Sequence, residues 1–453
     1  MDAMKPLLTL LATVALSSAA FASPATDLFN QADQYLQTQY FGPSTLDLKA
    51  LSAKYRAQLT AICAPIGEAC GYEKAEPVLA QMFADLQDGH AYYLSAQAVA
   101  AERAAQNNAV GPTPRVGIAS VRPSPDSPDR LIADVVEGSP AERAGLRYGD
   151  RWTGFNDAPW PTDEAGYTAA NARFTQLVRA GEMVTMSLVR GTERTKLEVA
   201  VKGELIQGRP RVNLTVRDDG IAVLRVKDFS PRGTAQAVHD AVRDAQTRGV
   251  KAIILDMRGN GGGLLNEGLE TGGAFLGTPI SEILTPRTNA ERDRVIYGYA
   301  NGVFTITDVS GQVLGRAVIV NPSVWTGPLT VLVDGNSGSA TERVAYYLQR
   351  VKRASIIGEP SAGVGNTNTS RLGLVNGGAA AFPTVQSFNP DGTPFPAKIQ
   401  PDVAVVGGTL ELFNTGRDAI LEKALETLKS AAAPTLEHIP VPNPVYSFFS
   451  SGF

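Results

Sequence analysis

Histidine and cysteine are scarce in this chain of 453 residues, which contains three histidines and two cysteines. Zinc sites in proteins are built mainly from these two side chains, so we expect no metal centre. An excess of positive charge is also lacking, because 45 Asp and Glu residues outnumber 41 Lys and Arg residues. Nucleic-acid binding requires a basic surface, and we therefore expect no nucleic-acid partner.

Apolar runs long enough to cross a membrane are absent as well. The longest run, residues 7–20, is shorter than the ~20 apolar residues of a spanning helix. It follows Lys5 and leads to an A-x-A cleavage site at 20–22. This order is typical of a secretory signal peptide over residues 1–22, with an uncleaved anchor as the alternative. We expect a periplasmic or secreted protein with no stable transmembrane segment after cleavage.

Residues 23–110 are predicted to be helical. Apolar residues recur there at intervals of three and four, for example over 48–62. A later helix of this region should end near Asp88-Gly89, because that pair favours a helix stop. This prediction leaves His90 on a loop just beyond the helix.

The two cysteines lie close together in the same region. They are Cys63 and Cys70 of the segment C-A-P-I-G-E-A-C. In an exported chain the compartment is oxidising and a disulfide between them can persist. A free buried pair is the alternative.

Residues 111–203 have the pattern of a small β-rich domain. Short apolar runs precede the segment E-G-S-P-A-E-R-A-G-L-R-Y-G-D (137–150), and two alternating strands follow it. This segment resembles the turn and short helix of a PDZ domain. The resemblance implies that backbone N–H groups of Val116, Gly117 and Ile118 capture the C-terminal carboxylate of a peptide. A spacer or a gate without a ligand is the alternative.

Residues 204–432 alternate between short apolar strands and amphipathic helices. Buried strands are predicted at 251–258, 329–334 and 354–359, with a closing helix over 417–430. This alternation predicts an α/β domain, in which helices cover a layered and mainly parallel sheet. The segment 433–453, which contains several prolines and aromatic residues, is expected to be a tail.

Two of these strands end in segments whose composition suits a binding or catalytic site. L-D-M-R-G-N-G-G-G-L-L (255–265) places close-packed backbone N–H groups at a helix start, which favours an anionic group. The segment lacks the lysine and the full glycine pattern of nucleotide sites. V-D-G-N-S-G-S-A-T-E (333–342) places Ser337 or Ser339 between a strand and a helix. A serine there acts as a nucleophile or as a helix cap.

Together the two segments resemble the carboxyl-terminal processing (tail-specific) serine proteases. That family combines a D-x-R-x-N-G-G-G strand end, an S-x-S-A-S-E-type nucleophile loop and a PDZ domain; 356–365 and 401–405 match two further family segments. The resemblance implies a crotonase-like core, Ser339 as the nucleophile, and an oxyanion hole from the backbone N–H groups of Gly263 and Ala340. It also implies cleavage of protein substrates near exposed, apolar C-termini, without a cofactor or metal.

The sequence departs from this family at the catalytic base. Val364 stands where the family has its general-base lysine, and Asn368 replaces the glutamine that orients that lysine. Valine cannot accept a proton, so a serine–lysine pair is not available at the usual place. Lys352, on the helix after Ser339, is expected to be a solvated charge at a helix end.

A second branch of the superfamily, which resembles the tricorn core protease, uses a histidine from the N-terminal region. A-D-L-Q-D-G-H-A-Y-Y (84–93) matches its aspartate-glycine-histidine stretch. His90 is therefore the expected general base, with a structural turn histidine as the alternative. His239 is expected on a helix surface, and His438 lies in the tail. The third catalytic member is unassigned, because the segment before Pro401 lacks the glutamate of that branch.

Two other functions compete with that of an exported serine endopeptidase. The first is a catalytically inactive pseudoprotease, a PDZ-bearing protein that only binds peptide tails. The retained serine and glycine segments argue against it, since a binding module needs neither. The second is an acyl-CoA enzyme of the crotonase type, and the export signal with a fused PDZ domain argues against such a substrate. The sequence does not predict the oligomeric state.

Overall fold

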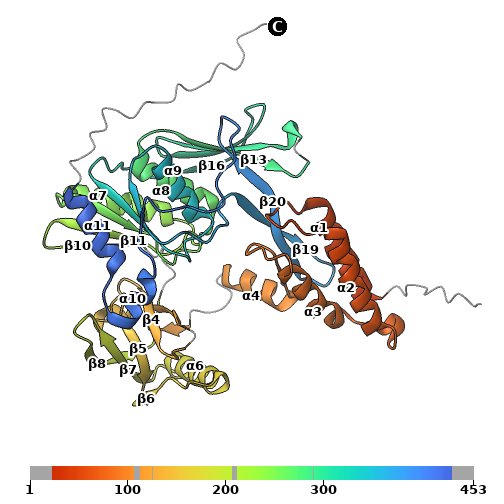
Figure 1. Cartoon of the computed structure of the whole chain (residues 1–453), viewed down its shortest axis with the longest axis horizontal. Coiled ribbons are helices and arrows are strands. Elements are labelled where there is room, and N and C mark those ends of the chain that lie inside the picture. The colour runs from red at the N-terminus through yellow and green to blue at the C-terminus, as the bar shows by residue number, and fades with distance from the viewer. Residues whose placement is uncertain (1–22, 107–112, 125, 207–211, 289, 431–453) are drawn as a thin grey trace, which may run out of the picture. The chain divides into compact units, whose positions relative to one another are not determined.

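The computed structural model describes residues 23–106, 113–124, 126–206, 212–288 and 290–430 (Figure 1). The predicted signal peptide and the predicted C-terminal tail lie outside these residues. The chain divides into two compact units, Met1–Ala100 with Arg371–Ala381, and Ala101–Ser370 with Phe382–Phe453. None of the helices in the described part of the chain is long and apolar enough to cross a membrane.

The first unit is built on three helices, α1 (Pro24–Gln39), α2 (Leu48–Cys63) and α3 (Tyr72–Ala84). Helix α1 begins at a capping box, in which the side chains of Ser23 and Thr26 each accept the other residue's backbone N–H. A 3₁₀ turn, η1 (Gly67–Ala69), separates α2 from α3. The structure joins Cys63 and Cys70 in a disulfide across this turn.

A short strand and a distant segment complete the first unit. Strand β1 (Tyr92–Leu94) precedes α4 (Ala96–Gln106) and pairs antiparallel with the first residues of β20 (Ala379–Phe388). The side-chain amide of Asn376 donates to Glu76, 300 residues away, and to Tyr93. Residues 371–381, which the sequence analysis placed in the core domain, therefore pack with the N-terminal helices.

The β-rich region of the second unit has a five-strand path in the order β3-β4-β5-β7-β8, with β6 added at β5 and a separate β2–β9 pair. Its elements are β2 (Pro114–Arg115), β3 (Ile118–Val121), β4 (Arg130–Val135), α5 (Pro140–Arg143), β5 (Arg151–Phe155), β6 (Ala158–Pro159), α6 (Glu164–Arg179), β7 (Met183–Arg190), β8 (Thr195–Lys202) and β9 (Glu204–Leu205). Trp152 lies at its centre, with ring centroids 4.8 Å from both Trp160 and Phe174. Its resemblance to a PDZ domain stays a prediction.

The central sheet of the second unit has the order β10-β11-β12-β17-β18-β21. The strands are β10 (Val212–Val216), β11 (Ile221–Val226), β12 (Ala252–Asp256), β17 (Leu329–Val333), β18 (Ser355–Gly358) and β21 (Val403–Ala404). Only β10 pairs antiparallel with its neighbour, and the other pairs are parallel. All five residues of β12 are buried, as expected for a parallel strand covered on both faces.

Helices pack on both faces of this sheet (Figure 1). One face contacts α7 (Thr234–Thr247), α8 (Leu265–Leu276) and α9 (Ala340–Arg350), and the opposite face contacts α11 (Ala419–Ser430). The short helix α10 (Gly408–Thr415) precedes α11. Successive residues of β12 point to opposite faces of the sheet. Ile253 packs on the face covered by α7, α8 and α9, and Ile254 packs on the face covered by α11.

A second large sheet is antiparallel and contains β1 and β20. Its other strands are β13 (Ile280–Pro286), β14 (Val295–Ala300), β15 (Val303–Asp308), β16 (Val313–Val318) and β19 (Thr367–Gly373), with η2 (Glu291–Asp293) between β13 and β14. Strands β13 to β16 follow one another in hairpins, and short connections between neighbouring strands force antiparallel pairing. The fold is α/β as predicted. The sheets are mixed, so the prediction of a mainly parallel sheet is not confirmed for the whole fold.

Candidate active site

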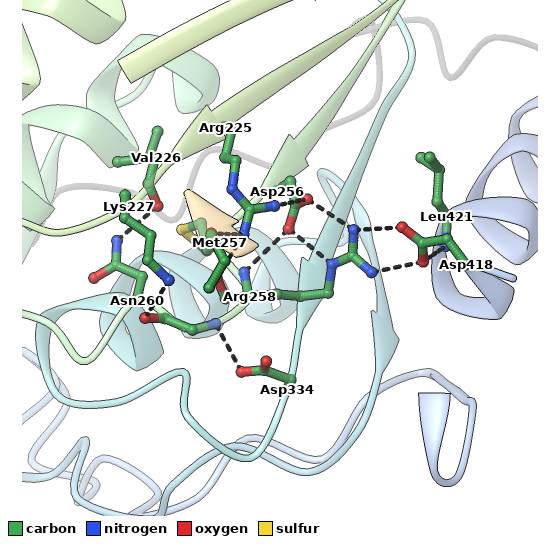
Figure 2. Close-up of polar contacts among 12 residues, drawn as sticks. Arg225, Val226, Lys227, Asp256, Met257, Arg258, Asn260, Asp334, Asp418 and Leu421 are labelled. Atoms are coloured by element: carbon green, nitrogen blue, oxygen red, sulfur yellow. Dashed lines mark hydrogen bonds and ion pairs between the residues drawn. The ribbon is translucent and has the colours of Figure 1, made fainter. Parts of the chain in front are cut away.

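Two loops meet at the carboxyl ends of the parallel strands β12 and β17, which are neighbours in the central sheet. Three hydrogen bonds join them, from Gly338 N–H to Asn260 O (2.9 Å), from Gly259 N–H to Asp334 Oδ1 (2.8 Å) and from Ser337 Oγ to Met257 O (3.0 Å). Figure 2 shows the carboxylate of Asp334 in this position. The structure thus brings together the two segments selected from the sequence.

The two candidate serines have different surroundings. Ser337 is fully buried, and its Oγ also accepts the N–H of Asp334 at 2.9 Å. Ser339 is partly exposed and precedes α9 with φ 56° and ψ −118°, a conformation that non-glycine residues rarely adopt. Strain at a sharp strand-to-helix turn is the geometry of a nucleophile elbow. The local structure therefore favours Ser339 as the reactive serine and gives Ser337 a structural role.

The glycine run lies directly against this serine. A Cβ placed on Gly262 would lie 2.6 Å from Ser339 Cβ and 2.9 Å from Ala340 N. The residues on either side of Gly263 are both hydrogen-bonded to Phe229, because Phe229 N–H donates to Gly262 O and Leu264 N–H donates to Phe229 O. Among the hydrogen bonds of the described residues, none uses the N–H of Gly263 or of Ala340. Two unused donors beside a serine are what an oxyanion hole requires.

The carboxylate of Glu342 ties the serine to a third loop. Oε2 accepts the N–H groups of Ser339 (2.8 Å) and Val364 (3.0 Å), while Oε1 accepts the N–H of Gly363 (2.8 Å) and the hydroxyl of Ser361. Burial raises the pKa of Glu342, and these hydrogen bonds offset part of that effect. Glu342 therefore fixes the backbone of Ser339 against this loop. Nothing in the sequence alone indicates this role.

Val364 lies beside the loop that carries Ser339. A Cβ placed on Gly338, the residue before Ser339, would lie 3.4 Å from Val364 Cγ2. The position of the family's lysine is thus adjacent to the nucleophile loop, and its side chain here is apolar. Asn368, at the position that would orient such a lysine, has no lysine partner. Its Oδ1 accepts from Arg343 Nη2 at 3.0 Å, and its buried Nδ2 has no partner among the residues that the structure describes.

A buried ionic network holds the first loop behind the glycines. Asp256, at the end of β12, bonds the guanidinium groups of Arg225 and Arg258, and Arg258 also bonds Asp418 (Figure 2). Burial alone would raise the pKa of Asp256, but the two guanidinium groups hold it below its ordinary value. The ring of Tyr148 stacks on Arg225 at 3.8 Å. This network fixes the strand end from which the oxyanion loop begins.

Lys227 is a residue of this neighbourhood that sequence reasoning missed. It follows β11, is 7% exposed, and donates from Nζ to Gly259 O at 3.0 Å (Figure 2). The buried ammonium therefore supports the backbone of the loop that carries Gly263. The only signal in the sequence is that this lysine directly follows a buried strand. The sequence does not show whether a lysine at such a position is buried or exposed.

His90 lies in the first unit, on the turn between α3 and β1. Its backbone N–H donates to Asp88 Oδ1 at 2.9 Å. The carboxylate of Asp88 is buried and also accepts the hydroxyl of Tyr40. This turn is therefore firmly held. Ser339 lies in the second unit, and the pairing of the two side chains stays a prediction.

The expectation that His239 lies on a surface is wrong. The residue is fully buried on α7, and its ring bonds the backbone of Ser323, the carbonyl of Glu270 and the hydroxyl of Tyr299. The neighbouring Asp240 and Arg243 suggested exposure, but residues 321–323 cover this side of the helix. Arg243, one turn after His239, donates to Asn321 O, and the backbone N–H of Ser323 donates to the His239 ring. Burial lowers the pKa of His239, so this histidine is a neutral structural group.

The predicted carboxylate loop lies at the start of β3, which is the end strand of its sheet. The carbonyls of Val116 and Gly117 accept from Ala141 and Val136, whereas no acceptor for the N–H of Val116 or Gly117 occurs among the described residues. Gly117 has φ +87°, and a Cβ there would lie 2.2 Å from Ser139 Cβ. The next residue, Ile118, begins the open strand.

Among the residues that the structure describes, no group of three or more His, Cys, Asp and Glu side chains is placed to hold a metal ion. The groups that the two loops do bring together are a serine hydroxyl and the backbone amides around it. Such an arrangement suits attack on a carbonyl carbon, followed by stabilisation of the oxyanion that forms.

Residues 220–405 match the family described as peptidase family S41. The chain is 28% identical over 279 residues to the carboxy-terminal-processing protease of Bartonella bacilliformis, covering 60% of this chain and 58% of that protein. It is 26% identical over 255 residues to the carboxy-terminal processing protease CtpA of Bacillus subtilis, covering 53% of this chain and 46% of that one. The chain thus spans about half the length of these curated relatives. The predicted resemblance to carboxyl-terminal processing serine proteases is confirmed.

A solved structure from Bacteroides fragilis, assigned as an S41 protease, shares the fold. It aligns with a TM-score of 0.53 at 16% identity and covers 88% of this chain and 97% of that one. At this identity the likeness concerns the architecture alone.

Proposed function

Since residues 220–405 match peptidase family S41, we propose that this protein is an exported serine endopeptidase of the carboxyl-terminal processing type. Ser339 is its nucleophile and His90 its general base. The observation that carries the proposal is the strained Ser339 beside the unused N–H groups of Gly263 and Ala340. A protein that only binds peptides has no use for this combination.

The reaction begins when Ser339 Oγ attacks the carbonyl carbon of the scissile peptide bond. A serine hydroxyl is a weak nucleophile until a base takes its proton, and we assign that step to His90, because Val364 cannot perform it. The oxyanion of the tetrahedral intermediate accepts hydrogen bonds from Gly263 and Ala340, each worth a factor of ~10²–10³ in turnover. His90 then returns the proton to the leaving amine. Water, deprotonated in turn, hydrolyses the acyl-enzyme.

The substrates that we propose are proteins with exposed, apolar C-termini, and cleavage takes place near those termini. The PDZ-like region supports this, because the loop Val116-Gly117-Ile118 offers unused N–H groups beside an open strand. Backbone amides of such loops capture free carboxylates. A periplasmic or extracellular location is supported by the disulfide between Cys63 and Cys70, since such bonds persist outside the reducing cytosol.

A fluorophosphonate probe tests the proposal directly. The full chain is expected to be labelled, Ser339→Ala should abolish labelling and peptide hydrolysis, and the loss of the nucleophile can cost on the order of 10⁶ in turnover. Ser337→Ala is the matched control, two residues away. It should keep much of the activity but lower the unfolding temperature, since its buried hydroxyl makes hydrogen bonds to Met257 and Asp334. Labelling that survives Ser339→Ala, or an unlabelled but folded wild-type chain, would contradict the proposal.

A further inference from the structure

A charged residue that the proposed reaction does not use lies against the loop at 361–365. This loop neighbours the nucleophile loop, because Ala362 N–H donates to Ser337 O at 2.9 Å. Residues 397–399 run along this loop, because Gly365 N–H donates to Ala397 O (2.8 Å) and Ser361 exchanges two hydrogen bonds with Ile399. Lys398 is the residue between these two anchors. Its backbone is therefore fixed on both sides.

The side chain of Lys398 covers Gly363. A Cβ placed on Gly363 would lie 2.9 Å from Lys398 Cε, 3.6 Å from its Cβ and 3.7 Å from its Nζ. Gly363 also has φ +93°, so the chain keeps this position free of a side chain and Lys398 occupies the space. The amide of Gly363 bonds Glu342, whose other oxygen bonds the N–H of Ser339. One carboxylate thus joins the nucleophile to the residue that Lys398 covers.

The ammonium group of Lys398 is exposed and has no partner among the described residues. Glu342 is the nearby carboxylate, but its two oxygens already accept four hydrogen bonds. A positive charge without a protein partner, held against a loop that is hydrogen-bonded to the nucleophile loop, attracts negative charge on the substrate.

We propose that Lys398 is a specificity-determining residue that pairs with a carboxylate of the bound peptide close to the scissile bond. The inference rests on the proposed function, because it assumes that the peptide lies across Ser339. Two sources supply a carboxylate there, an acidic side chain near the scissile bond or the terminal α-carboxylate of a short leaving tail. Lys398 does not act as the base.

The experiment uses the full chain and two pairs of peptides. One pair carries Glu or Gln near the scissile bond, and the other ends in a free acid or an amide. Hydrolysis is measured as kcat/KM for the wild type and for Lys398→Gln, Lys398→Arg and Lys352→Gln. Lys352 is the matched control, since it is also exposed but precedes β18, at the amino ends of the parallel strands, whereas the candidate site lies at their carboxyl ends. The same pairs are titrated against these variants in the Ser339→Ala background, where binding is read without turnover.

An exposed ion pair is expected to give about a fivefold preference for the charged member of one pair, falling as ionic strength rises. Lys398→Gln should reduce that preference to less than about twofold, while Lys398→Arg and Lys352→Gln keep it. The pair that shows the preference identifies the source of the carboxylate. Because the PDZ-like loop also favours free acids, only the part of the preference that Lys398→Gln removes is assigned to Lys398.

Equal preferences in the wild type and in Lys398→Gln, or no preference in either pair, would overturn the inference. Failure of the proposed function gives a different result, namely no hydrolysis by any chain. In that case the binding titrations in the Ser339→Ala background still decide whether Lys398 pairs with a carboxylate.

Discussion

The oxyanion loop contains two adjacent glycines with different surroundings. A Cβ on Gly262 would meet Ser339 Cβ at 2.6 Å and Ala340 N at 2.9 Å, and its φ is +97°, whereas a Cβ on Gly261 would have no atom within 4 Å. We expect Gly262→Ala to displace the serine and the Ala340 donor, and to lower kcat by about 10²-fold or more. Gly261→Ala is the control and should keep most of the activity. Equal kinetics for the two variants would show that the loop does not touch the reacting atoms.

The charge of the base sets the pH dependence of the reaction. A general base must be unprotonated, and free histidine has a pKa of ~6.5. Activity on a peptide substrate should therefore rise through about pH 6–7, and His90→Ala should remove most of it. A lysine base would place the rise at higher pH unless burial depressed the pKa of the amine. Activity that survives His90→Ala with an unchanged pH profile would contradict the assignment of His90 as the base.

At the scale of the element, α8 carries a buried acid that the reaction does not use. Glu270 is 3% exposed, and its Oε1 has no hydrogen-bond partner among the described residues. Burial, together with the charge of Glu267, raises the pKa of Glu270 from 4.5 to about 7. The folded protein therefore holds a proton on this carboxyl at pH values where the unfolded chain has released it.

Because the pKa of Glu270 is raised in the folded protein, the free energy of unfolding should fall as the pH rises. The contribution of Glu270 is fully present below pH 4.5 and is lost as pH rises through about 7, a difference of roughly 3 kcal/mol between the two limits. Unfolding by denaturant at pH 5 and pH 8 measures it, and Glu270→Gln should flatten the difference between the two pH values. Glu411→Gln, at a partly exposed position of α10, serves as the control. A Glu270→Gln chain with the wild-type pH dependence would contradict the assignment.

Local patterns in the sequence predicted the elements that build the site. The two strand ends were recognisable because a buried strand, a glycine run and a serine before a helix follow one another within a few residues. The choice of Ser339 came from the family resemblance, and the strained φ of that residue supplies an independent physical reason. His239 was misjudged because residues 321–323, about 80 positions away in the sequence, cover the side of the helix that carries it.

Contacts over long sequence distances account for what the sequence did not predict. The buried pair of Glu282 and Arg343 joins β13 to α9, and no local pattern marks either partner. The pairing of β1 with β20 joins segments almost 300 residues apart. Strands β13 to β16 mix apolar and polar residues, whereas buried parallel strands such as β12 are continuous apolar runs that stand out in the sequence. The antiparallel sheet was therefore not recognised.

At the scale of the whole molecule, we predict a peptide-binding site in the β-rich region. Strand β3 is the end strand of its sheet, and the amides of Val116 and Gly117 lack acceptors among the described residues. Both features are needed to add a peptide strand and to bind its terminal carboxylate. A substrate held there by its C-terminus would have a raised effective concentration at the nucleophile.

The test is a comparison of one apolar peptide in its free-acid and amidated forms, bound to the full chain in the Ser339→Ala background. Hydrogen bonds to a charged group are worth ~1.5–3 kcal/mol, so the free acid should bind about tenfold more tightly or better. Gly117→Ala should remove this difference, because a Cβ would lie 2.2 Å from Ser139 Cβ. Gly138→Ala has a comparable φ of +69° with nothing within 4 Å of its Cβ, and it controls for backbone strain. Free acid and amide that bind alike to the parent chain would rule out carboxylate capture by this loop.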